Sequence, residues 1–173
     1  MNPSILIAGV GNIFLGDDAF GVETVRALAQ RQLPGGVSVV DYGSRGFDLA
    51  YALLDPWDAV IFVDALPRGG PAGTLYVMEP DLSRMRDPLS ADMSLNPHGM
   101  DPVRVLQLAF AVGEVTAKVY LVGCEPADFG PEFNGRMGLS EIVQASITQA
   151  VEMLENLVVC IRATAGVSLA ETL

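Results

Sequence analysis

The sequence is short of basic residues. Ten lysines and arginines stand against 21 aspartates and glutamates, so the chain has a formal net charge of −11 at pH 7. This excess of negative charge repels the backbone of nucleic acids and the surface of anionic membranes. We therefore expect neither a nucleic acid nor a membrane as a partner.

Long hydrophobic runs are also missing. No stretch of about 18 uncharged apolar residues occurs, which is the length a membrane-spanning helix requires. The first four residues lack the charged region that opens a signal peptide, and the apolar run Ile5–Val10 is short enough to be a strand. These absences predict a cytoplasmic protein.

Cysteine is scarce. Cys124 and Cys160 are far apart and form no C-x-x-C motif, so neither a thiolate zinc site nor a disulfide framework is indicated. Both are predicted to be small core residues. Hydrophobic residues make up 50% of the 173 positions, which is ample for the core of one domain.

What the sequence does contain is an alternation of strand and helix patterns. Apolar, β-branched runs predict strands over Ile5–Val10, Val37–Asp41, Ala59–Ala65, Thr74–Met78 and Val119–Val122. Helical spacing predicts helices over Val22–Ala29, Gly46–Leu54, Pro102–Val112 and Glu141–Ile161, with Asp101 and Ser140 as N-caps of the last two.

This order predicts an α/β fold, a three-layer sandwich whose twisted sheet is mostly parallel. The link Pro67–Gly73 is too short for a crossover helix, so Thr74–Met78 is predicted to be an antiparallel edge strand. Residues 1–162 are interpreted as one α/β domain, with a long polar loop over Asp81–Pro97. Residues 163–173 are interpreted as a loosely held C-terminal tail.

A glycine-rich stretch, GVGNIFLGDDAFGV, follows the first predicted strand. It begins like the dinucleotide-binding motif G-x-G-x-x-G, but the third glycine of that motif falls on Phe14, and no G-K-[ST] follows to make a phosphate loop. A nucleotide site is therefore disfavoured. Two adjacent carboxylates, Asp17 and Asp18, need another explanation, and one of them is predicted to cap the following helix.

Ligands of open α/β sheets bind at the carboxyl ends of the strands, where this chain carries mostly oxygen ligands. Asp18 follows the first strand, Asp64 ends the third, and His98, the only histidine, precedes the Pro102 helix. Two carboxylates and one imidazole suit a divalent metal such as Ni²⁺ or Zn²⁺. Taken singly, Asp64 could instead close a turn, and His98 could be a solvated loop residue.

The motifs together resemble those of the hydrogenase maturation proteases. The resemblance rests on Gly9–Asn12 with Asp17, Asp18 and Gly21, then Val63–Ala65, Gly73-Thr74 and Pro97–Gly99, and it runs in order from about Ile5 to Leu157. It implies an α/β sandwich and an endopeptidase that removes the C-terminal extension of the large-subunit precursor of a nickel–iron hydrogenase. The family commonly has D-G-G-T-x-G where this chain has Asp41–Gly46, so Tyr42 replaces a glycine.

The resemblance also implies a role for the three candidate residues. Asp18, Asp64 and His98 would recognise nickel already installed in the precursor, so nickel would be carried by the substrate and the protein, expected to be a monomer, would hold no metal tightly. No H-E-x-x-H helix of an independent zinc peptidase is present. Asp64 or Asp18 could act as base, whereas the absence of G-x-S-x-G argues against a serine mechanism.

A phosphoacceptor receiver domain is the alternative. Receivers also place an acidic pair after the first strand and an aspartate at the end of the third, with a metal between them. However, a receiver needs a lysine after the fifth strand. The only lysine, Lys118, precedes that strand.

Overall fold

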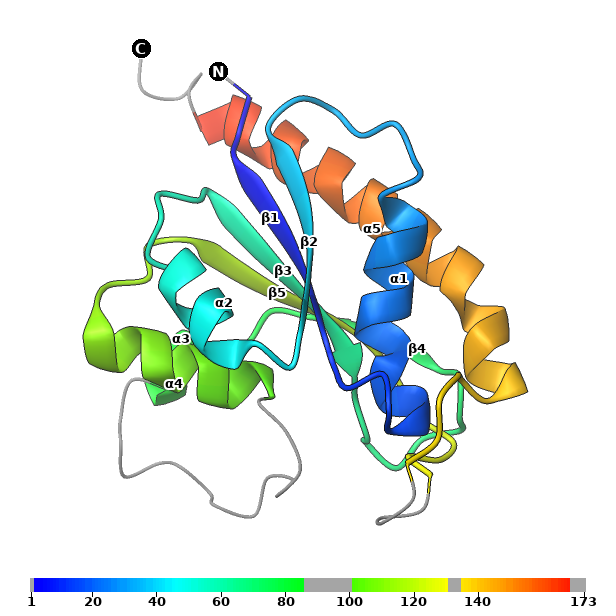
Figure 1. The fold of residues 1–173 in the computed structure, drawn as a ribbon. Coiled ribbons are helices and arrows are strands. Elements are labelled where there is room, and N and C mark those ends of the chain that lie inside the picture. Colours follow the sequence, from blue (N-terminus) through cyan, green and yellow to red (C-terminus); the bar gives the residue numbers. More distant parts are fainter. Residues whose placement is uncertain (1, 86–100, 131–134, 169–173) are drawn as a thin grey trace.

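A five-stranded sheet forms the centre of the protein in a computed structural model that describes residues 2–85, 101–130 and 135–168 (Figure 1). The strands are β1 (Ile5–Val10), β2 (Val37–Gly43), β3 (Ala59–Ala65), β4 (Leu75–Met78) and β5 (Lys118–Cys124). The helices are the 3₁₀ turn η1 (Gly16–Ala19), α1 (Phe20–Leu28), α2 (Gly46–Ala52), α3 (Leu82–Met85), α4 (Pro102–Val112) and α5 (Glu141–Ser168).

The strand order is β2-β1-β3-β5-β4. All neighbouring pairs are parallel except β4 and β5, which run antiparallel. The prediction of a mostly parallel sheet with one antiparallel edge strand is therefore confirmed. The parallel strands bring their carboxyl ends to one edge, and this is where the candidate residues of β1 and β3 lie.

Helices cover both faces of the sheet, so the predicted three layers are present (Figure 1). Along β1, Ile5 and Ile7 belong to the core that α1 and α5 close, whereas Leu6 and Ala8 belong to the core under α2 and α4. Successive side chains of a strand point to opposite faces, so a strand that is apolar throughout can serve both cores. Continuous burial of β1 and β3 fits this arrangement.

Some local predictions differ from the structure. Helix α5 continues to Ser168, whereas we predicted a loosely held segment from Ala163 onward; no proline interrupts the helix, and Thr164 Oγ1 donates to the Cys160 carbonyl. A short helix, α3, begins inside the predicted loop. Cys124 is buried as predicted, but Cys160 is exposed because it lies on the outward side of α5. Within the described residues, none of the helices is both long enough and apolar enough to cross a membrane.

Candidate functional site

The turn between β1 and α1 depends on glycines that allow very close packing. Gly11 has a φ of +136°, and a Cβ atom there would overlap the carbonyl oxygen of Asp18. A Cβ atom on Gly21 would overlap the carbonyl oxygens of Val10 and Val63. The glycines therefore let the turn fold back on itself and let α1 approach β1 and β3, which sets Asp18 at the carboxyl edge of the sheet.

Asp18 is half-buried within this turn. Its Oδ2 accepts a hydrogen bond of 2.7 Å from the backbone N–H of Asn12. Burial raises the pKa of the Asp18 carboxyl, and the hydrogen bond from Asn12 opposes the rise only in part. The carboxylate is thus held in a fixed position with little solvent around it.

Asp64 lies near the end of β3 and is only 7% exposed. Its Oδ1 accepts a hydrogen bond of 2.8 Å from the N–H of Ala65. Burial raises the pKa of Asp64 well above its ordinary value, and the negative charges of Asp18 and Asp101 raise it further, against the hydrogen bond from Ala65. The charge of Asp18 thus acts on Asp64, and both residues lie at the carboxyl edge of the sheet.

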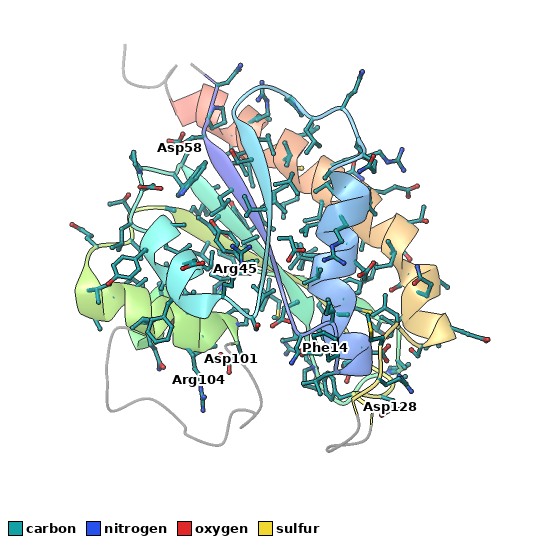
Figure 2. All side chains as sticks on the ribbon, viewed as in Figure 1. Phe14, Arg45, Asp58, Asp101, Arg104 and Asp128 are labelled. Carbon is teal, nitrogen blue, oxygen red and sulfur yellow. The ribbon has the colours of Figure 1, made fainter. Side chains whose placement is uncertain are left out.

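Asp101 is a third carboxylate at this edge. As predicted, it caps α4, because its Oδ1 accepts a hydrogen bond of 2.9 Å from the N–H of Arg104. Figure 2 shows it where α4 begins. Its other oxygen, Oδ2, is buried and has no hydrogen-bond partner among the described residues. From the sequence we predicted only the helix cap for Asp101. Its effect on the pKa of Asp64 depends on tertiary packing. Its position three residues after His98 could have indicated that it lies near the site.

His98 lies outside the described residues, so the prediction that it joins the two aspartates remains a prediction. Among the residues that the structure describes, no group of three histidine, cysteine, aspartate or glutamate side chains could hold a metal ion. Of the three predicted ligands, the described residues therefore contain only Asp18 and Asp64.

Asp17 supports the turn that carries Asp18, one of the two roles expected of it, and does not cap the following helix. Its side chain makes no cap hydrogen bond to η1 or α1. Fully buried, it instead accepts four hydrogen bonds, from the N–H groups of Ala127, Asp128 and Ser140 and from the Ser140 hydroxyl, at 2.6–3.0 Å. Burial alone would raise the pKa of Asp17, but these hydrogen bonds outweigh burial and the pKa is lowered. Asp17 therefore ties the turn that carries Asp18 to the segment before α5.

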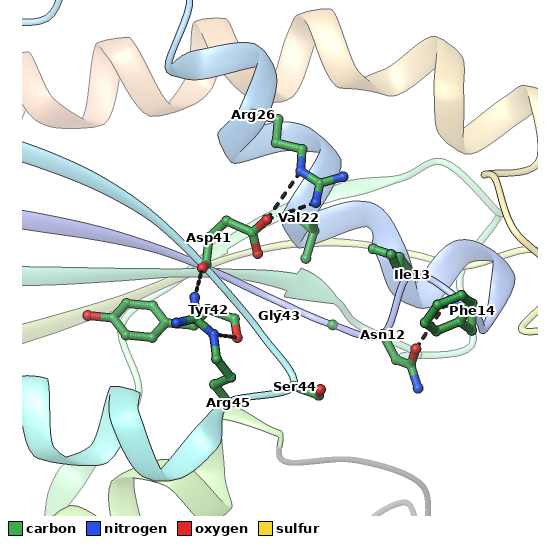
Figure 3. Close-up of a pocket in the computed structure, with 11 residues that line it drawn as sticks. Asn12, Ile13, Phe14, Val22, Arg26, Asp41, Tyr42, Gly43, Ser44 and Arg45 are labelled. Carbon is green, nitrogen blue, oxygen red and sulfur yellow. Dashed lines mark hydrogen bonds and ion pairs between the residues drawn. The ribbon is translucent and has the colours of Figure 1, made fainter.

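A cleft of about 390 Å³ opens beside the turn, between the ends of β1 and β2 (Figure 3). Its lining is mixed in polarity and comes from the turn, from α1 and from the end of β2: Gly11, Asn12, Ile13, Phe14, Val22, Arg26, Asp41, Tyr42, Gly43, Ser44 and Arg45. Asn12 lines the cleft and also donates to Asp18. Asn12 therefore links the lining of the cleft to Asp18.

The basic residue that a receiver domain requires is not supplied by Lys118. This residue begins β5, where it pairs in register with Ala59 at the start of β3. Its ammonium lies 3.4 Å from Glu79. Lys118 is therefore at the end of the sheet opposite Asp64, and the geometry disfavours the receiver alternative.

Comparison with known proteins agrees with the fold. The sequence profile of the hydrogenase maturation protease family matches residues 22–157, a range that contains Asp64 and His98 and begins after Asp18. The hydrogenase 2 maturation protease of Escherichia coli is 33% identical over 152 residues, which cover 87% of each chain. A putative hydrogenase maturation protease of Methanocaldococcus jannaschii is 31% identical, covering 87% of this chain and 93% of its own.

Solved structures give the same result. The hydrogenase 2 maturation peptidase of a Thaumarchaeota archaeon superposes with a TM-score of 0.64 at 32% identity, covering 87% of this chain and 95% of that one. The hydrogenase maturating endopeptidase HybD of E. coli gives a TM-score of 0.67 at 30% identity, covering 87% and 89%. The resemblance found in the motifs is confirmed over most of the chain: the protein belongs to the hydrogenase maturation protease family.

Proposed function

We propose that this chain is the endopeptidase that removes the C-terminal extension of a nickel–iron hydrogenase large-subunit precursor after nickel has been inserted. In this proposal Asp18, Asp64 and His98 recognise the nickel, which arrives as part of the substrate. The protein itself holds no metal tightly. Membership of the family supports the class of reaction, and the site supports the mode of recognition.

The observation that carries the proposal is the pairing of Asp18 with Asp64 at the carboxyl edge of the sheet. Two carboxylates so close that one raises the pKa of the other repel each other unless a proton or a cation lies between them. A divalent ion would relieve this repulsion. Two oxygen ligands and one imidazole leave such an ion partly coordinated, so thiolates of the precursor's own nickel site would complete its ligand set.

Because the pKa of Asp64 is raised, recognition of nickel is coupled to the protonation of this carboxyl. Burial and the neighbouring charges raise the pKa of Asp64, whereas an approaching nickel centre favours its carboxylate form. Binding of the nickel-loaded precursor would therefore lower this pKa, and a nickel-free precursor would not.

Hydrolysis then requires that a water molecule attack the scissile carbonyl. Nickel held between enzyme and precursor would polarise that carbonyl or activate the water, and Asp64 or Asp18 would accept the proton of the water. Asp18 is the more exposed of the two carboxylates. It is therefore the better placed to exchange protons with solvent.

The test compares nickel-loaded with nickel-free precursor, the latter in the presence of a chelator, and follows the mass of the precursor. We expect a small mass loss for the loaded precursor only. Efficient cleavage of the nickel-free precursor would overturn nickel recognition. Cleavage of neither precursor would overturn the proposed substrate.

Two variants test the residues. His98→Ala and Asp64→Asn should each abolish cleavage while the far-UV circular dichroism spectrum is unchanged and thermal unfolding stays cooperative. His98 stands between Pro97 and Gly99 in the sequence, where little core packing is expected, and asparagine keeps the size of Asp64. Loss of activity together with gross unfolding would assign a structural role instead. The proposal also places the reaction in the cytoplasm, with the protein acting as a monomer, which cell fractionation and light scattering would check.

A further inference from the structure

We propose that the cleft beside Asp18 seats an extended, uncharged segment of the substrate polypeptide next to the bond that is cut, and that the ring of Phe14 is the apolar contact for that segment. This inference rests on the proposed function and adds to it a peptide-binding subsite and a residue that determines specificity.

Phe14 is an exposed aromatic residue on a rigid stretch of backbone. Its side chain is 57% exposed. Its N–H donates to Asn12 Oδ1 at 2.9 Å, and its carbonyl accepts from the N–H of Arg136 at 2.8 Å. The ring therefore adds little to the core, while the backbone that carries it is held from both sides. A ligand that covers the ring would not have to order this backbone, which lowers the entropy cost of binding.

The cleft and the candidate site are connected through Asn12. The backbone N–H of Asn12 donates to Asp18. The side-chain oxygen of Asn12 accepts from the N–H of Phe14 (Figure 3). A polypeptide that extends from the two aspartates into the cleft would pass along the turn that carries Phe14. Ile13, Val22 and Tyr42 provide further apolar surface in the lining.

The charges of the cleft are already paired, which defines the chemistry of the ligand. Arg26 lies 3.0 Å from both Glu23 and Asp41. Arg45 lies 3.7 Å from Asp48, and its guanidinium donates to the backbone carbonyls of Asp41 and Tyr42. A neutral segment would leave these pairs intact, whereas a charged side chain would have to compete for them.

The size of the cleft agrees with a short peptide segment. A volume of about 390 Å³ falls at the lower end of the range of ligand pockets and accommodates only a few residues. The side-chain NH₂ group of Asn12 and the hydroxyl of Ser44 belong to residues of the lining and are of the kind that binds peptide groups. The cleft thus combines an apolar contact with polar groups suited to a backbone.

The experiment measures KM and kcat for the nickel-loaded precursor with the full chain and its Phe14→Ala variant. Phe47→Ala is the matched control, because Phe47 is also a phenylalanine, is 63% exposed and does not line the cleft. We expect Phe14→Ala to raise KM about tenfold with kcat within about twofold, and Phe47→Ala to leave both unchanged. Unchanged KM for Phe14→Ala, or an equal rise for both variants, would overturn the subsite.

A second arm identifies the substrate residue. Each aliphatic residue flanking the cleaved bond is replaced by alanine and, separately, by aspartate, and the full chain is compared with its Phe14→Ala variant. One alanine substitution should raise KM in the full chain but not in the variant, and aspartate at that position should raise it more. Additive effects at every position would overturn the contact.

If the full chain cleaves no nickel-loaded precursor, the proposed function fails. If it cleaves normally but Phe14→Ala has no effect, only this inference fails.

Discussion

Gly11 and Asp18 are in direct backbone contact, because the carbonyl oxygen of Asp18 occupies the place that a side chain on Gly11 would need. The φ of Gly11, +136°, is also one that residues with a Cβ atom rarely adopt. The start of the glycine-rich turn thus fixes the position of the carboxylate at its end. The glycines are required because they allow the close packing that positions Asp18. A phosphate-binding site is not needed to account for them.

Gly11→Ala should therefore disrupt the turn. We expect a loss of about 3 kcal/mol or more in the free energy of unfolding, measured by urea denaturation, since both the overlap with Asp18 and the backbone strain must be relieved. Gly69→Ala is the matched control: Gly69 has a φ of +80°, but a Cβ atom there would meet no atom within 4 Å. That variant should lose only about 1 kcal/mol, the cost of the left-handed backbone alone. Equal losses would show that the overlap is relieved without cost.

Asp64→Asn should stabilise the protein at neutral pH while it abolishes cleavage. Because the pKa of Asp64 is higher in the folded than in the unfolded state, the folded state binds the proton more tightly, and stability falls as pH rises from about 4 through the raised pKa. Asparagine can still accept the hydrogen bond from Ala65 but carries no charge. Urea denaturation should show a gain of about 1 kcal/mol above the raised pKa that shrinks toward pH 4. A loss of stability at neutral pH would contradict this prediction.

Asp17→Asn should have the opposite effect on stability. The lowered pKa of Asp17 means that its contribution is complete above about pH 4 and is lost only as pH falls through the lowered value. Asparagine offers one acceptor oxygen where four hydrogen bonds end, so we expect a loss of about 3 kcal/mol that is constant from pH 5 to 8. Asp48→Asn, at an exposed position, should change stability by less than about 0.5 kcal/mol. A loss for Asp17→Asn that varied within this pH range would contradict the assigned pKa shift.

The sequence predicted those features that depend on local patterns. Runs such as Ile5–Val10 and Ala59–Ala65 are apolar throughout because both faces of the parallel sheet are covered, and their ends placed Asp18 and Asp64 at one edge. The role of Asp17 could not be predicted in this way, because its hydrogen-bond donors lie 110 to 123 residues further along the chain. The exposure of Cys160 likewise depends on which side of α5 faces the sheet.

Asp101 provides the sharpest test of how the charges at the site act on one another. Asparagine caps helices about as well as aspartate, so Asp101→Asn should preserve the hydrogen bond to Arg104 and the stability of α4 while it removes the negative charge near Asp64. The pKa of Asp64 should then fall toward its ordinary value. If cleavage requires the Asp64 carboxylate, the acidic limb of the pH profile of kcat/KM should move to lower pH.

Asp101→Ala separates this charge effect from the cap. It removes the charge as well, but it also removes the acceptor for the Arg104 N–H, so it should lose about 1 kcal/mol of stability that Asp101→Asn retains. Both variants should shift the acidic limb in the same direction, because both remove the charge. A shift in Asp101→Ala alone would assign the effect to the cap and the placement of α4. An unchanged limb in both variants would show that the charge of Asp101 does not reach the reacting carboxylate.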